Sequence, residues 1–175
     1  MTEELTYLPT NDIMFKLIFG SIGNEKITQK FIESILGKKI KPITLGHKLE
    51  LEIPSPTSKQ MVADVIAKDK EQKKYVLEMQ RTKTKGLLQR FLGYDCKLYV
   101  SGIKKKEQYD TIKQATLIVI MEEPFPGLEK IKDYHTVIDL AIKAHTEIEF
   151  NNVIQLHIIE LEKYQEQKKS AGKIE

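Results

Sequence analysis

Hydrophobic residues at helical spacing predict three helices in this chain. An apolar stripe over residues 13–18 ends at Gly20, and a second over residues 24–36 is followed by Gly37, a residue that favours helix C-termini. A longer stripe predicts a helix over residues 84–102. The residues expected on its buried side are Leu87, Leu88, Phe91, Leu92, Leu98 and Tyr99.

Elsewhere the apolar residues alternate with polar ones or form short continuous runs, which are both typical of strands. Strands are predicted at residues 43–53, 62–67, 75–79, 115–121, 136–142 and 153–161. Pro54 and Pro56 close the first strand, and a polar turn at residues 68–73 joins the second to the third. The order of elements predicts a mixed α/β or α+β domain with helices packed on a central sheet.

The length and composition are those of one globular domain. The chain has 175 residues, of which 41% are hydrophobic and 30% charged, so wholesale disorder is excluded. We expect a single domain over residues 1–164 and a polar tail over residues 165–175 that frays. The lone Cys96 excludes an intrachain disulfide framework, and its mid-helix place favours a buried structural thiol.

Positive charge is concentrated in one segment. Residues 81–106 contain eight Lys or Arg and one acid, a charge of +7 against +3 for the whole chain, which leaves −4 elsewhere. A basic segment beside a mildly acidic body indicates a polyanionic partner, with nucleic acid the first candidate. A solvated lysine-rich helix face is the other interpretation of the same pattern.

Several classes of protein receive no support. The longest apolar run, residues 117–121, is too short to span a bilayer, and the N-terminus lacks a signal-peptide core, so we expect a cytoplasmic protein. No phosphate-cradling glycine loop is present, so no nucleotide cofactor is expected. The histidines lack zinc-site spacing; they are His47, His135, His145 and His157.

Two carboxylates in the predicted hairpin carry the chemistry. A turn centred on Glu71 places Asp64 directly opposite Glu78, with the Cβ atoms about 5 Å apart. Like charges this close among apolar neighbours call for a cation, and a hard divalent ion fits carboxylate oxygens. In the alternative, a register slip or solvent exposure lets one carboxylate pair with Lys68 or Lys74.

These residues resemble the D…(D/E)-x-K signature of the PD-(D/E)XK nuclease superfamily, with Gln80 at the lysine position. The wider pattern resembles the Rpn family of recombination-promoting nucleases and transposases over residues 8–164. The matching residues are Asn11-Asp12-Ile13-Met14-Phe15-Lys16, Asp64, Glu78-Met79-Gln80, Arg90, Tyr94 and Tyr99.

The resemblance implies a restriction-endonuclease-like core, a central mixed sheet flanked by helices. It also implies that Asp64 and Glu78 ligate Mg²⁺ or Mn²⁺, with the Met79 carbonyl as a backbone ligand. Asp12 is then an auxiliary acid facing the same metal, or else a plain N-cap. Gln80 replaces the lysine that orients the attacking water or steadies the charge of the phosphorane; an amide positions water but supplies no positive charge.

The helix after the carboxylates supplies the expected contacts to nucleic acid. Arg90, Tyr94 and Lys97 are spaced to share one helix face and would contact the scissile phosphate or the DNA backbone. Lys83 and Lys85, near the start of that helix, would bind further phosphates. Ordinary helix surface is the alternative interpretation of these five residues.

The sequence therefore favours a metal-dependent DNA endonuclease of low sequence specificity, linked by resemblance to DNA recombination and mobile elements. The alternative is a catalytically degenerate, DNA-binding or partner-binding regulatory module on the same fold. RNA as the substrate is not separated from DNA. By analogy a homodimer is expected, and the family's usual helical C-terminal region is expected to be missing.

Overall fold

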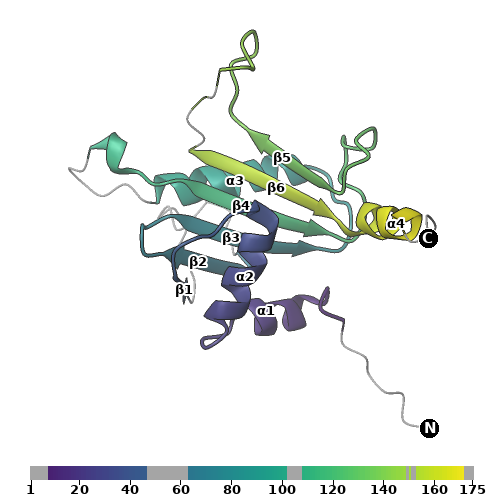
Figure 1. Ribbon diagram of the computed structural model, residues 1–175, viewed down its shortest axis with the longest axis horizontal. Helices are drawn as coiled ribbons and strands as arrows, with labels where there is room; N and C mark the ends of the chain where they lie inside the picture. Colours follow the sequence, from purple (N-terminus) through teal and green to yellow (C-terminus); the bar gives the residue numbers. More distant parts are fainter. Residues whose placement is uncertain (1–7, 47–62, 102–107, 149, 151–152, 172–175) are drawn as a thin grey trace.

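The computed structural model describes residues 8–46, 63–101, 108–148, 150 and 153–171. Its elements follow the predicted order with a C-terminal helix added (Figure 1). They are α1 (Asp12–Gly20), α2 (Glu25–Leu36), β1 (Ile43–Gly46), β2 (Val65–Asp69), β3 (Lys74–Gln80), α3 (Leu87–Val100), a 3₁₀ turn (Tyr109–Thr111), β4 (Ala115–Met121), β5 (His135–Asp139), β6 (Ile154–Glu160) and α4 (Leu161–Ala171).

The strands form one mixed sheet in the order β1-β2-β3-β4-β6-β5. The pairs β3–β4 and β4–β6 are parallel and the others antiparallel. In the β2–β3 hairpin Val65 faces Leu77 and Ile66 faces Val76, which confirms the predicted register. Because β3, β4 and β6 end at the same edge, this edge gathers the residues at their carboxyl ends.

Helices cover both faces of the sheet, as predicted (Figure 1). One core cluster contains Phe91 and Leu98 of α3 together with Val76 of β3 and alternate residues of β4 and β6. The other contains Phe15 of α1, Ile32 of α2 and buried residues of β1, β2, β3 and β4. Every residue of β4 is buried, because this central strand is covered on both sides.

The last turn of α1 is tied to α2 and lies close to β2. The side-chain amide of Asn24 donates to two carbonyl oxygens of α1, at 2.9 and 3.1 Å, and the Thr28 hydroxyl donates to the Phe19 carbonyl at 2.6 Å. A Cβ on Gly20 would lie 3.3 Å from a methyl of Val65. Glycine therefore permits the close approach that sets α1 beside the start of β2.

The helical phase of α3 differs from the sequence prediction at several positions. Leu88 and Leu92, expected to be buried, are each 38% exposed, and Cys96 is exposed rather than buried. Tyr94 and Asp95 take buried places instead. Successive helix residues differ by about 100°, so a small rotation of the helix against the sheet decides which neighbours it buries.

Some element boundaries also differ. The predicted strand over residues 43–53 is β1 in its first four residues, and residues 47–62 lie outside the described part. β5 ends at Asp139, three residues before the predicted end. α4 crosses the boundary expected at residue 164, and the division into domain and tail stays a prediction. None of the helices described is both long and apolar enough for a bilayer crossing.

Asp95 is an acid placed inside the core. Asp95 is fully buried, and neither of its carboxylate oxygens has a hydrogen-bond partner among the described residues. Burial raises the pKa of Asp95 to about 8 from an ordinary value of 3.8. The folded protein therefore keeps this proton at a pH where the unfolded chain has lost it.

Asp95→Asn is expected to stabilise the protein increasingly as pH rises from about 4 to about 8, with no further gain above that. The gain should reach a few kcal/mol, since each pKa unit corresponds to about 1.4 kcal/mol. Urea unfolding at pH 5, 7 and 9 measures it, with Asp110→Asn, at an exposed position, as the control. A pH-independent difference between Asp95→Asn and the parent would contradict the proposed burial of a titrating acid.

Candidate active site

Asp64 and Glu78 meet where β2 begins and β3 nears its end. The backbone N–H of Asp64 donates to Glu78 Oε1 at 3.1 Å, and the backbone N–H of Met79 donates to Asp64 Oδ2 at 3.0 Å. These reciprocal bonds hold the two carboxylates together, as the hairpin register predicted. Neither Lys68 nor Lys74 neutralises them, because Lys74 reaches Leu98 and Ser101 instead and Lys68 forms no ion pair among the described residues.

Glu78, the second carboxyl group of the site, lies in surroundings that disfavour its charged form. Glu78 is only 5% exposed. Burial raises the pKa of Glu78 to about 8, and the negative charge of Asp64 adds to the rise. The backbone bond from Asp64 and the positive charges of Arg90 and Lys16 oppose it. Two adjacent acids with cations on either side form an arrangement that further positive charge would stabilise.

Lys16 forms an ion pair with Asp64. Its Nζ lies 3.0 Å from Asp64 Oδ1, and 47% of its side chain stays exposed. The hydrogen bond to Asp64 raises the pKa of Lys16; partial burial opposes this rise, while the charges of Asp64, Asp12 and Glu78 add to it. Sequence reasoning quoted Lys16 within a motif but gave it no role, because its reach depends on how α1 packs.

Asp12 lies one helical turn before Lys16 and is exposed. Its alternative role as the N-cap is wrong, because Asn11 caps α1: the Asn11 side-chain oxygen accepts from the backbone N–H groups of Ile13 at 3.0 Å and Met14 at 3.3 Å. Asp12 is instead in the first turn, where its charge acts on Lys16. Its role as an auxiliary acid stays a prediction.

Gln80 is already engaged on both sides of its amide. Its Oε1 accepts from the guanidinium of Arg90, and its Nε2 donates to the Thr82 carbonyl at 2.7 Å. The guanidinium of Arg90 also lies 4.8 Å from the ring centre of Phe91. Residues two apart on a strand share a face, so Glu78 and Gln80 both point toward α3. Gln80 thus anchors Arg90 beside the carboxylates.

The predicted nucleic-acid contacts are divided between two places. Lys83 and Lys85 are exposed in the segment that joins β3 to α3, at the site end of the sheet, and line a hollow of about 460 Å³. Tyr94 is buried, and its pKa is raised by burial and by the charge of Glu78. Lys97 lies near the C-terminal end of α3. There the ammonium of Lys74, at the start of β3 and away from Glu78, donates to the Leu98 carbonyl. The structure therefore separates Lys97 from the carboxylates.

The donor set at this edge fits a hard divalent cation. Asp64 and Glu78 offer carboxylate oxygens, and the predicted backbone ligand Met79 belongs to the same stretch of β3. Among the described residues no three His, Cys, Asp or Glu side chains cluster for a metal. Two carboxylates with open positions suit Mg²⁺, which keeps several waters when bound to protein. Such an ion would favour the charged form of Glu78, which burial otherwise disfavours.

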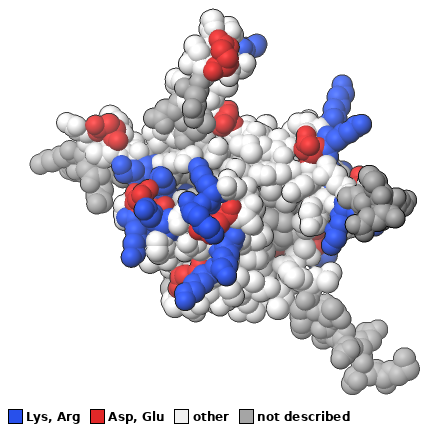
Figure 2. Space-filling model, viewed as in Figure 1, with Lys and Arg blue, Asp and Glu red and all other residues white. Residues whose placement is uncertain are grey.

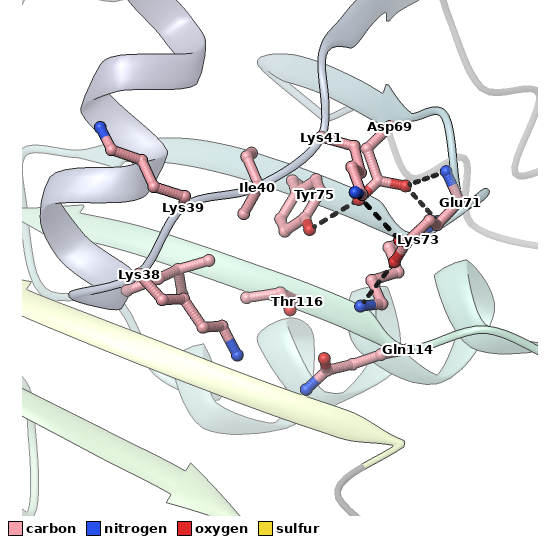
Figure 3. A pocket seen from close by; sticks show the side chains of 11 residues that line it. Lys38, Lys39, Ile40, Lys41, Asp69, Glu71, Lys73, Tyr75, Gln114 and Thr116 are labelled. Atoms are coloured by element: carbon pink, nitrogen blue, oxygen red, sulfur yellow. Dashed lines mark hydrogen bonds and ion pairs between the residues drawn. The ribbon is translucent and has the colours of Figure 1, made fainter.

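A second hollow, of about 300 Å³, lies at the opposite end of the strands (Figure 3). Lysines and acids stand side by side over this part of the face (Figure 2). Glu71 pairs with Lys73 at 3.1 Å and with Lys41 at 4.0 Å, and Asp69 accepts two backbone N–H bonds and the Tyr75 hydroxyl. These interactions hold the hairpin turn together, and the hollow is lined by neither Asp64 nor Glu78.

Two of the four histidines form a pair that their sequence spacing did not reveal. His135 Nε2 and His157 Nδ1 are 2.9 Å apart because β5 and β6 are neighbours in the sheet. Burial lowers the pKa of His157 to about 4, and the nearby charges of His135 and Lys38 add to the shift. A neutral, hydrogen-bonded histidine pair is a core feature, and the described residues add no third metal ligand.

The comparisons with known proteins identify a family. The family model described as PD-(D/E)XK nuclease family transposase matches residues 9–173, nearly the whole chain. Neither the curated proteins nor the solved structures contain a match. The match confirms the resemblance inferred from the sequence, and the mixed sheet with flanking helices agrees with a PD-(D/E)XK nuclease-like fold.

Gly20→Val is expected to destabilise the protein by about 1–3 kcal/mol, because added methyl groups push α1 away from Val65 and β2. Gly46→Val is the matched control, since a Cβ at that strand position meets no atom within 4 Å among the described residues. Urea unfolding of both variants checks this expectation. Equal stability of the two variants would show that the contact between Gly20 and β2 does not constrain α1.

Proposed function

Because the chain belongs to the PD-(D/E)XK nuclease family transposases, we propose that it is a metal-dependent DNA endonuclease of low sequence specificity. The observation that carries this proposal is the joined pair of Asp64 and Glu78 at the edge where the parallel strands end. PD-(D/E)XK nucleases generally use divalent metals. The pair provides carboxylate oxygen donors for such an ion, and the charge of the ion would favour the ionised form of Glu78.

A bound Mg²⁺ or Mn²⁺ would polarise the phosphodiester and lower the pKa of water. The residues of the chain perform the remaining tasks. Asp64 and Glu78 would hold the ion, and the bond from the Met79 N–H fixes the orientation of Asp64. Arg90, anchored by Gln80, keeps positive charge beside Glu78 from the α3 side.

Phosphate contacts that read no bases explain the low specificity we propose. Lys83 and Lys85 project from the exposed segment between β3 and α3, next to the end of β3 that carries Glu78. Lysine ammonium groups bind phosphates through charge, which positions a duplex without reading its sequence. The substrate would therefore be bound by its backbone across this edge.

Asp64→Asn and Glu78→Gln are each expected to lower plasmid nicking by at least about 100-fold, because each removes a charged oxygen donor from the ion. Supercoiled plasmid is incubated with purified protein in Mg²⁺, in Mn²⁺ and in EDTA. Asp139→Asn, an exposed strand residue on β5, is the matched control, and circular dichroism checks the fold.

Nicking that is retained in EDTA, or equal in Asp64→Asn and the parent, would contradict the proposal. Absence of nicking together with salt-sensitive DNA binding would instead support the regulatory module on the same fold.

Lys83→Ala/Lys85→Ala is expected to weaken DNA binding and to reduce the slope of log K against log salt by about 2, since two phosphate contacts are lost. Fluorescence anisotropy at several salt concentrations measures the slope. The matched control is Lys26→Ala/Lys30→Ala, two exposed lysines of α2. An unchanged slope in the first variant would remove these lysines from the DNA-binding surface.

A further inference from the structure

The position that a lysine occupies in the D…(D/E)-x-K signature is filled by Gln80, and Gln80 is not free to replace it. Its amide oxygen holds Arg90 and its amide nitrogen holds the Thr82 carbonyl. An amide also carries no positive charge to offset a developing phosphorane. The site therefore needs its mobile cation from elsewhere.

Arg90 does not meet this need. Its guanidinium is held by Gln80 and lies over the ring of Phe91, and its Nε is buried without a hydrogen-bond partner among the described residues. These contacts keep the charge of Arg90 beside Glu78 and fix its position. A guanidinium held in this way stabilises the site before substrate binds and is not free to move to a phosphate.

Lys16 has the geometry that Gln80 and Arg90 lack. One N–H of its ammonium is used at 3.0 Å by Asp64 Oδ1, while about half of the side chain stays in contact with solvent. An ammonium has three N–H donors, so two remain for oxygen atoms of a substrate. Within the described part of the chain, Lys16 is the lysine paired with either carboxylate of the site.

The position of Lys16 is fixed by the fold. Phe15, the preceding residue, is buried in the core, and Gly20 lets the end of α1 approach β2. Asn24 and Thr28 tie the same turn to α2. The ammonium is therefore presented to Asp64 by a helix that contacts the core, β2 and α2.

We propose that Lys16 contacts the scissile phosphate and its attacking water, the task that lysine performs at position 80 in the superfamily signature. This inference rests on the proposed nuclease function and names a further catalytic residue for it. In the reaction the water oxygen bonds to phosphorus and the bond from phosphorus to the 3′ oxygen breaks. The water loses one proton and the 3′ oxygen gains one, so Lys16 stays protonated and contributes charge and hydrogen bonds.

The first test removes the lysine at position 16 and then places one at position 80. Lys16→Ala is expected to lower the plasmid-nicking rate by about 100-fold, the loss typical of a removed transition-state donor. Lys16→Ala/Gln80→Lys is expected to recover at least about tenfold of that loss, because the new ammonium extends from the end of β3. Lys26→Ala, an exposed helix lysine, is the matched control, and thermal unfolding verifies that each variant folds.

A second test does not need turnover. Binding of a phosphorothioate DNA duplex in Ca²⁺ is measured by anisotropy, and Mn²⁺ binding by calorimetry. Lys16→Ala is expected to bind the duplex about tenfold more weakly, the value of roughly one charge-assisted hydrogen bond, while Lys26→Ala matches the parent. Mn²⁺ affinity should not fall, since Lys16 donates to Asp64 and ligates nothing.

The outcomes separate the two proposals. Full nicking by Lys16→Ala overturns the role of Lys16 and leaves the nuclease proposal intact. Faster nicking and tighter Mn²⁺ binding by Lys16→Ala also overturn it, because the ammonium would then only compete with the metal ion for Asp64. If the parent protein does not nick at all, the nuclease proposal fails, and duplex binding alone tests the role of Lys16. Weaker binding by Lys16→Ala but not by Lys26→Ala then supports a phosphate contact of Lys16. Unchanged binding by Lys16→Ala overturns that contact.

Discussion

Repulsion between two adjacent acids is the constraint around which this fold is arranged. Asp64 and Glu78 lie beside each other because the β2–β3 hairpin has a single register, and Glu78 is buried. Within the hairpin, the backbone N–H groups of Asp64 and Met79 donate to the two carboxylates. Positive charge comes from outside the sheet, from Lys16 on α1 and from Arg90 on α3. The helix layers on opposite faces thus each deliver one cation to the same edge.

The two cations are held by different physical means, and this divides their roles. Arg90 is fixed by Gln80 and by packing on Phe91, and its Nε is buried. Lys16 lies at the end of a flexible stem that remains half exposed. A guanidinium fixed by neighbouring side chains stabilises the ground state of the carboxylates, whereas an exposed ammonium keeps donors for a ligand.

The sequence was informative wherever local pattern decides structure. The hairpin register, the buried strand β4 and the juxtaposition of Asp64 with Glu78 all follow from the period-two pattern and the turn. Properties set by packing between distant elements could not be predicted. The burial of Asp95 and the exposure of Cys96 depend on the rotation of α3, and the reach of Lys16 depends on how α1 docks.

Placing the essential lysine on a helix, as we propose, changes what the site depends on. A lysine at position 80 would be held by the β-ladder, whose hydrogen bonds to β4 persist as long as the sheet does. Lys16 is held by α1, which is short and rests on a few contacts to α2 and on the close approach at Gly20. Short helices owe their stability to tertiary packing. Loosening of α1 would therefore disable the site while the sheet and both carboxylates stayed in place, so the stability of the site is set by α1 rather than by the sheet.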